Sequence, residues 1–150
     1  MGGRGGVSPP SATHRVIGVD PGRRRIGVAL GTNGVASPLE VIHRTSSLDA
    51  DLRRLVNLVD EWEATAVVVG LPLTLNGDHG PAAVAATTLA ERLARLTSVP
   101  VEMHDERLTT VTAERAMVEA GLDGVQRRRS VDKVAAAVML QSWLDARAGA

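Results

Sequence analysis

The sequence predicts an α/β domain in three layers, with a mixed central sheet of about five strands and helices on both faces of the sheet. The 150 residues are 44% hydrophobic, which suffices for one core and one domain. Three strand-like segments come first, and helix-like and strand-like segments then alternate along the chain. A starting meander followed by right-handed crossovers places helices on both sides of one mixed sheet.

The first part of the domain is predicted to form three neighbouring strands, at residues 15–20, 26–30 and 35–42. Pro38 indicates that the third strand is irregular or lies at an edge of the sheet. A face of small residues lets a helix backbone approach closely. Alternation gives the second strand such a face, with Ile26, Val28 and Leu30 on one side and Gly27, Ala29 and Gly31 on the other.

The second part of the domain alternates helices and strands. Ser46 and Asp49 match a helix start signal, and apolar residues follow at helical spacing as far as Trp62. The continuously apolar residues 66–71 are typical of a central strand that is buried on both faces. The remaining predicted elements are a helix at 81–96 with Ala85, Leu89, Leu93 and Leu96 on one stripe, a strand at 99–106, a short helix from Thr109 or Thr110 to Gly121, an arginine-rich connector, and a helix from Val131 to about Ala148.

Composition excludes several classes of protein. A net charge of zero and a pI near 6.9 argue against a surface that attracts nucleic acid everywhere, so affinity for phosphate must come from local clusters. The absence of cysteine rules out disulfides and thiolate zinc sites, and no apolar run is long enough for a membrane span. Without Phe or Tyr there is no aromatic platform for unpaired bases, which favours recognition of the nucleic-acid backbone. We expect a soluble, cytoplasmic protein in which residues 1–14, rich in Gly, Ser and Pro, form a disordered tail before the domain at 15–150.

Three acidic spots stand at the ends of predicted elements. Asp20 ends the first strand, where Asp-Pro-Gly is also an excellent turn sequence that needs no catalysis. Asp105 and Glu106 point to opposite faces if their strand stays regular, so we take Glu106 as the site residue and Asp105 as a turn cap or supporting residue. Asp132 heads the apolar stripe of the last helix, where it is either a site residue or a first-turn acid that the helix dipole favours.

These acids suit a metal-dependent reaction on a polyanion. Carboxylates that pack together repel each other, and a hard cation such as Mg²⁺ or Mn²⁺ removes that penalty. Two such ions ~3.5–4 Å apart activate water and stabilise the leaving oxygen when a phosphodiester is cleaved. We therefore expect Asp20, Glu106 and Asp132 to be both catalytic residues and metal ligands. Flanking phosphates would be held by the arginines beside these acids, namely Arg23, Arg24, Arg25, Arg107, Arg127, Arg128 and Arg129.

Five segments together resemble the YqgF/RuvX family. They are Val19-Asp20-Pro21-Gly22, Arg25-Ile26-Gly27-Val28-Ala29, Gly70-Leu71-Pro72, Asp105-Glu106-Arg107-Leu108-Thr109-Thr110 and Val131-Asp132-Lys133-Val134-Ala135-Ala136, of which the fourth is the most specific. The resemblance spans residues 16–143 and implies an RNase H-like fold with Asp20, Glu106 and Asp132 as the acidic set. It also implies a bacterial cytoplasmic nuclease that processes the 5′ end of pre-16S rRNA in ribosome biogenesis, in contact with ribosomal precursor particles. The chain departs from the family at residues 31–34, where an acidic residue is common, and this departure leaves the proposed ligands in place.

Other functions stay open at this point. A Holliday junction resolvase acting on branched DNA is the nearest alternative and requires a homodimer, whereas an RNA nuclease could be a monomer or a homodimer. A non-catalytic nucleic-acid-binding module for ribosome assembly would bind RNA without divalent ions. An ATPase of the sugar-kinase type binds nucleotide between two related domains, and this chain has length for only one.

Overall fold

The computed structural model describes the backbone of residues 14–109 and 124–148, and the side chains of residues 14–107 and 134–148. The short helix predicted up to Gly121 lies outside the described residues, as does the predicted tail apart from His14. The elements in chain order are β1 (Arg15–Pro21), β2 (Arg25–Thr32), β3 (Val35–His43), α1 (Leu48–Glu61), β4 (Ala66–Leu71), α2 (Pro81–Leu96), β5 (Val101–Asp105), the 3₁₀ helix η2 (Glu106–Thr109) and α4 (Gly124–Ala148).

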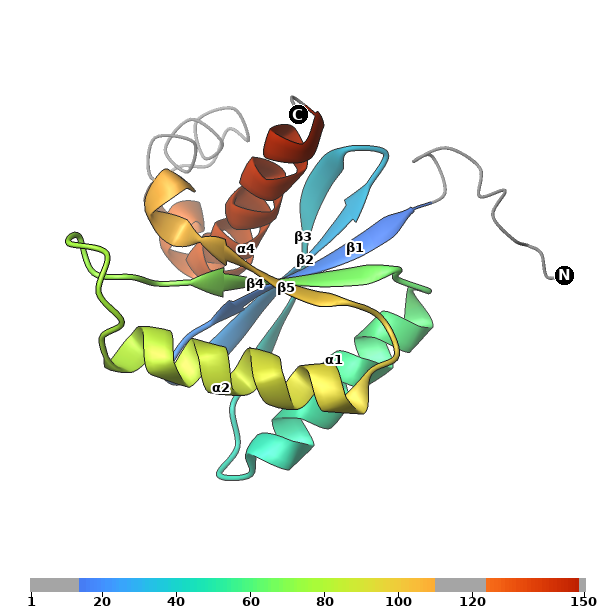
Figure 1. Ribbon diagram of the computed structural model, residues 1–150. Coiled ribbons are helices and arrows are strands. Elements are labelled where there is room, and N and C mark those ends of the chain that lie inside the picture. The colour runs from blue at the N-terminus through green and yellow to red at the C-terminus, as the bar shows by residue number, and fades with distance from the viewer. Residues whose placement is uncertain (1–13, 110–123, 149–150) are drawn as a thin grey trace, which may run out of the picture.

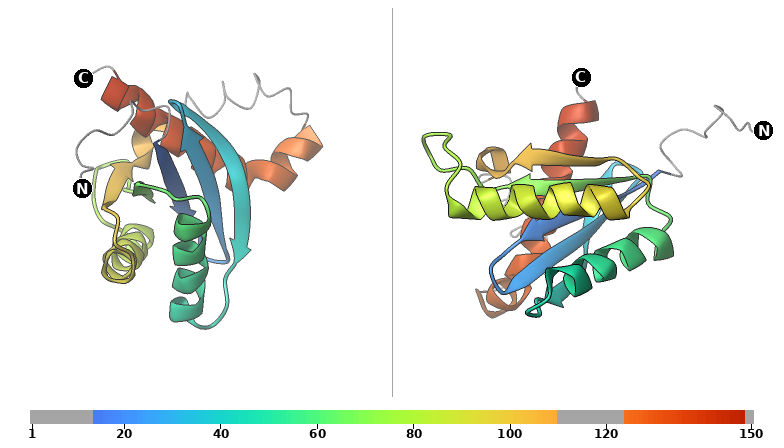
Figure 2. Two further views of the ribbon diagram at one scale, coloured as in Figure 1. Left: turned by 90° about the vertical axis from the view of Figure 1, so that its right-hand side faces the viewer. Right: turned by 60° about the horizontal axis from the view of Figure 1, so that its bottom comes forward.

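Within the described residues, five strands form one mixed sheet in the order β3-β2-β1-β4-β5. The meander β1-β2-β3 is antiparallel, whereas β4 runs parallel to β1 and β5 runs parallel to β4. The helices α1 and α2 cover one face of the sheet and α4 covers the other (Figure 1), and the turned views in Figure 2 show the same three layers. The predicted three-layer α/β architecture is confirmed.

Alternating residues of β1 belong to different halves of the core. Ile17 packs in the cluster beneath α1 and α2, whereas Val16 packs in the cluster beneath α4. Small residues let α4 come close to the sheet, since a Cβ added at Gly18 would stand 2.8 Å from the Cβ of Leu140. Gly31 on β2 lies against the same helix, which confirms the predicted small face of that strand.

The ends of several elements differ from the predictions. The N-cap of α1 is Ser47 instead of Ser46, because Ser47 has the extended backbone from which its Oγ accepts the amide of Ala50 at 3.1 Å. β5 is shorter than predicted and ends at Asp105. In α2 the predicted stripe was wrong at Ala85 and Leu96, which are exposed; the buried stripe consists of Ala83, Ala86, Leu89, Ala90 and Leu93.

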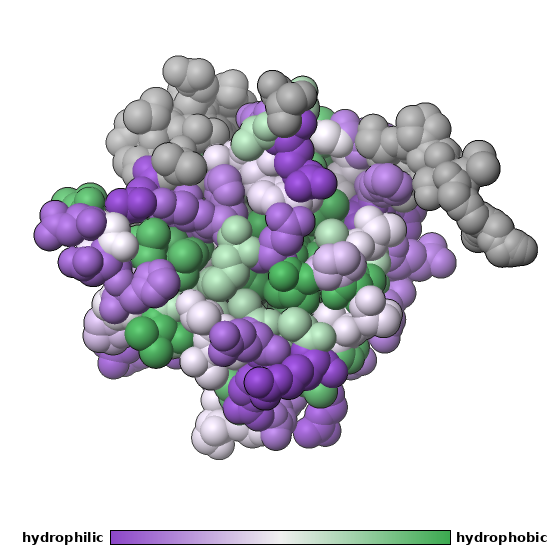
Figure 3. Space-filling view, viewed as in Figure 1, coloured by the Kyte–Doolittle hydropathy of each residue, from purple (hydrophilic) through white to green (hydrophobic). Residues whose placement is uncertain are grey.

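Two features concern the surface. β3 is an edge strand, as Pro38 predicted, and its register with β2 shifts between Val28 and Ala29. In Figure 3 hydrophobic side chains gather near the middle of the viewed face, around β5, with hydrophilic side chains about them.

Among the described residues, no helix has both the length and the apolar character that a membrane crossing requires.

Candidate active site

Asp20 lies near the carboxyl end of β1, in the middle of the sheet. β1 pairs with β4 as far as Val19 opposite Val69, so Asp20 is the first residue of β1 beyond that parallel ladder. On its other side Asp20 stands opposite Gly27 of β2. Since side chains alternate along a strand, Asp20 projects on the same face as Gly18, which is the face that α4 covers. The predicted position of this acid at a strand end is confirmed.

Glu106 reaches Asp20 from two strands away. It follows the last residue of β5 and begins η2, and β4 lies between β5 and β1. Its side chain passes over Gly70 of β4, where an added Cβ would stand 2.8 Å from Glu106 Oε1 and 3.0 Å from Glu106 Cγ. The carboxyl of Glu106 makes a side-chain hydrogen bond with Asp20. Glycine at position 70 is therefore what lets the two acids meet.

The meeting of the two acids changes the protonation of Glu106. Burial, followed by the hydrogen bond with Asp20 and by the negative charges of Asp20 and Asp105, raises the pKa of Glu106 to about 9. A hydrogen bond between two carboxyl groups requires a proton on one of them, and Glu106 carries that proton at neutral pH. The two carboxyl groups thus share a proton, and a cation can bind to their oxygens in place of that proton.

Asp105 turns to a different partner. Its Oδ1 accepts the backbone N–H of Arg107 at 2.9 Å, and its Oδ2 accepts Nη2 of the Arg107 guanidinium at 2.6 Å. The hydrogen bond from the Arg107 side chain is the main reason why the pKa of Asp105 lies below its usual value. Asp105 thus caps the turn at the end of β5, one of the two roles predicted for it. The Arg107 guanidinium also lies beside Gly77, in the loop that follows β4.

His104 faces α4 from the same strand. Its Nε2 lies 3.0 Å from Oγ of Ser142, and burial, partly offset by Asp105, lowers the pKa of His104. The neutral imidazole thus links β5 to α4 next to the carboxylate pair.

The third predicted acid, Asp132, lies in α4, but its side chain is outside the described residues. The same holds for the side chains of Arg127, Arg128 and Arg129. The backbone corrects one prediction, because α4 begins at Gly124 and not at Val131, so the arginine-rich connector is helical. Asp132 is therefore not in the first turn, and the helix-dipole explanation for it does not apply.

Carboxylate oxygens are the donors that Mg²⁺ and Mn²⁺ prefer, and the Asp20–Glu106 pair fits such an ion. Two like carboxyl groups held in contact repel when both are ionised, and a divalent cation relieves that repulsion. Within the side chains that the structure describes, no group of three or more His, Cys, Asp or Glu residues could hold a metal ion.

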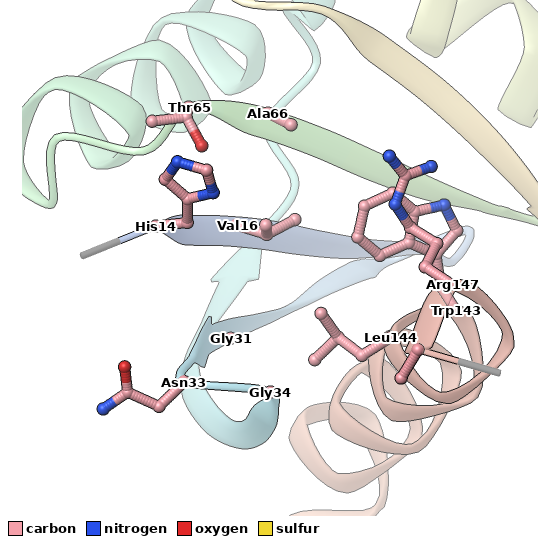
Figure 4. A pocket seen from close by; sticks show the side chains of 11 residues that line it. His14, Val16, Gly31, Asn33, Gly34, Thr65, Ala66, Trp143, Leu144 and Arg147 are labelled. Carbon is pink, nitrogen blue, oxygen red and sulfur yellow. The ribbon is translucent and has the colours of Figure 1, made fainter. Parts of the chain in front are cut away.

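A hollow of about 410 Å³ lies at the other end of β1 from Asp20. Figure 4 shows His14 and Val16 from the start of β1 on one side of it and Trp143 and Arg147 from α4 on the other. The Arg147 guanidinium covers the Trp143 ring at 4.5 Å from its centroid. This cavity is separate from the carboxylate pair.

Sequence reasoning missed the parts that support the acids. Gly70 was noted as part of a family motif, although its role in admitting Glu106 depends on which strand lies between β1 and β5. Asp51, which is 2% exposed in α1, gave no signal beyond that of an ordinary first-turn acid. It accepts hydrogen bonds from Thr45, just before α1.

The five-stranded mixed sheet with helices on both faces places the protein in the RNase H-like class. Among solved structures, the fold is similar to that of T. thermophilus RuvC in complex with a Holliday junction substrate, with a TM-score of 0.62, 18% identity, and coverage of 91% of this chain and 96% of that one. Residues 14–146 match the model of the RuvX family, whose description is Holliday junction resolvase, and the chain belongs to this family.

Curated relatives match over nearly the whole chain. A protein of Mycobacterium sp. (strain KMS), named "Putative pre-16S rRNA nuclease", is 50% identical over 150 residues, which cover 98% of this chain and 88% of the relative. A protein of Roseiflexus sp. (strain RS-1) with the same name is 46% identical over 133 residues, which cover 87% of this chain and 94% of the relative. The family resemblance found in the sequence is confirmed.

Proposed function

We propose that this protein is a nuclease that hydrolyses phosphodiester bonds with Mg²⁺ or Mn²⁺ and processes the 5′ end of pre-16S rRNA. The observation that carries the proposal is the Asp20–Glu106 pair, in which Asp20 of β1 and Glu106, the residue after β5, are held in contact on the face that α4 covers. Its support from the comparisons is the name shared by the Mycobacterium and Roseiflexus relatives. We place the protein in the cytoplasm, where it would act on ribosomal precursor particles.

Three acids would bind the divalent cation in this proposal. Asp20 and Glu106 supply carboxylate oxygens, and Asp132 supplies the further donor; it stands four residues before the fully buried Ala136 in α4. A divalent cation held there would supply Lewis-acid chemistry, activating water and stabilising charge on the phosphate oxygens. Binding of the cation would require Glu106 to release the proton of its hydrogen bond with Asp20.

Arginines hold the substrate in this proposal. Asp105 fixes the guanidinium of Arg107, the residue after Glu106, and the Arg107 side chain is still 37% exposed, so it can meet a phosphate. Arg23, Arg24, Arg25, Arg127, Arg128 and Arg129 complete the proposed set of phosphate contacts. These contacts position the strand without reading its bases.

A second candidate is a Holliday junction resolvase that acts on branched DNA. The description of the family model favours it. A junction has two strands to cut, so this function requires a homodimer that presents two Asp20–Glu106 pairs. A non-catalytic RNA-binding module is the third candidate and would need no divalent ion.

The test compares cleavage of a pre-16S rRNA fragment and of a four-way DNA junction, each with Mg²⁺, with Mn²⁺ and with EDTA. Asp20→Asn should lower the rate roughly 100-fold or more while the protein stays folded, because a ligand matters at least as much as the groups behind it. Asp60→Asn, an exposed acid of α1, is the matched control and should cleave like the parent. Cleavage by Asp20→Asn at the rate of the parent would refute the nuclease proposal, and cleavage of the junction alone by a dimer would select the resolvase.

A further inference from the structure

A basic hollow of about 620 Å³ lies between the β1–β2 turn and the junction of β3 with α1. It is lined by Arg23, Arg24, His43, Arg44 and Thr45. Arg23 and Arg24 come from the turn that follows Asp20, and both are exposed. The structure thus brings two of the three arginines of the first run together with residues that lie about twenty positions further on. We call this set the basic pocket.

Arg44, one of the residues that line the basic pocket, is held by two hydrogen bonds to the β1–β2 turn. Its backbone N–H donates to the carbonyl of Arg24 at 2.8 Å, and its Nη1 donates to the carbonyl of Gly22 at 2.9 Å. The side chain therefore bridges back across the turn and is 24% exposed. These contacts use only part of the guanidinium fork, which offers five N–H donors. A guanidinium whose position is already fixed loses little entropy when it binds an anion.

A buried acid stands behind Arg44. Asp51 is 2% exposed, and its Oδ1 accepts the backbone N–H of Thr45 at 3.0 Å. Its Oδ2 lies 3.7 Å from Nε of Arg44 and has no hydrogen-bond partner among the described residues. Because Asp51 is covered, it orients Arg44 from inside the protein and does not face the solvent side of the pocket.

The basic pocket adjoins the carboxylate pair along the chain. Gly22, whose carbonyl binds Arg44, follows Asp20 by two residues, which is about 7 Å along an extended backbone. The lining is polar and cationic and contains no Phe, Tyr or Trp. Such a cationic surface suits a phosphate group.

We propose that the basic pocket binds a backbone phosphate of the nucleic-acid strand next to the phosphodiester held at Asp20 and Glu106. This inference rests on the proposed function and adds His43, Arg44 and Thr45 to the surface that the substrate contacts. Arg23 and Arg24 supply exposed positive charge, and Arg44 supplies a guanidinium that the turn holds in position. Asp51 is a positioning residue that acts through Arg44.

The test measures the salt dependence of binding with a fluorescein-labelled RNA hairpin, by anisotropy in EDTA between 50 and 200 mM KCl. Each phosphate contact contributes about one to the slope of log K against log[salt]. The double variant Arg23→Gln/Arg24→Gln should therefore have a slope that is lower by about two, and the parent should lose roughly 10- to 20-fold more affinity than the variant over this fourfold change in salt. A His43→Gln variant should weaken binding with its fold intact.

Arg95→Gln is the matched control, because Arg95 is an exposed arginine in the last turn of α2, outside the basic pocket. It should keep the slope of the parent. A double variant whose slope equals that of Arg95→Gln, with an unchanged melting temperature, would overturn the inference. Since the assay contains no divalent ion, its outcome is independent of cleavage: a lowered slope in a protein that cleaves nothing would keep the basic pocket and refute the nuclease proposal alone.

Discussion

Replacing Gly70 by alanine should separate the two carboxyl groups without unfolding the protein. The new Cβ would stand 2.8 Å from Glu106 Oε1, whereas ordinary contacts begin at 3.4 Å, so this oxygen must move by at least 0.6 Å (3.4 − 2.8). A shift approaching 1 Å in a catalytic group costs up to ~10²-fold in rate, so we expect a loss of roughly 10- to 100-fold. The atoms displaced are the far end of a flexible side chain, so the free energy of unfolding should change by less than about 1 kcal/mol.

The assay has two readouts and a matched control. Cleavage in Mg²⁺ reports the rate, and an NMR titration of the Glu106 carboxyl reports its pKa, which should fall when the hydrogen bond with Asp20 lengthens. Gly18→Ala introduces the same methyl group on the same face, but 2.8 Å from the Cβ of Leu140, which cannot swing away. This control should lose about 1–3 kcal/mol of stability. The reasoning fails if Gly70→Ala keeps both the parent rate and the parent pKa of Glu106.

Two further predictions concern stability. The pKa of Glu106 in the folded protein is about 9, above its ordinary 4.5. Between pH 4.5 and pH 9, folding is therefore accompanied by the uptake of a proton. The stabilising effect of that proton is complete below pH 4.5 and is lost as the pH rises through 9. Glu106→Gln should therefore raise the melting temperature in EDTA at pH 9, and an unchanged pH profile would contradict the raised pKa. Asp51→Ala should cost about 2–4 kcal/mol in urea unfolding, because it leaves the amide of Thr45 and the guanidinium of Arg44 without their buried partner. Asp51→Asn keeps an acceptor and should cost less, and equal losses in the two variants would show that the acceptor is unimportant.

Local patterns carried much of the fold. The small face of β2 predicted a close helix because alternation depends only on neighbouring residues, and Gly31 does lie against α4. The N-cap of α1 was missed by one residue, since Ser46 and Ser47 are chemically alike and only the backbone angles distinguish them. The start of α4 was missed because the arginine run carries no apolar stripe, which is the main sequence signal of a helix. Its helix propensity alone did not distinguish it from a connector.

The candidate site was predictable only in part. Asp20 and Glu106 could be selected because each stands at the end of a predicted strand, and strands that run parallel bring their carboxyl ends to one edge. Their direct contact could not be predicted, because it depends on the order β1-β4-β5 and on the empty space above Gly70. Arg44 escaped notice for the same reason, since it contacts a turn some twenty residues earlier, and Asp51 escaped notice because it acts through Arg44.

The position of β1 in the sheet gives the two acids unequal mobility. β1 is paired on both sides from Val16 to Val19, just before Asp20, so these amides should exchange with solvent deuterium only when the whole domain unfolds. Glu106 instead follows the edge strand β5, where fraying needs only a fraction of that free energy. Local opening at the end of β5 would therefore separate Glu106 from Asp20 while the rest of the domain stays folded.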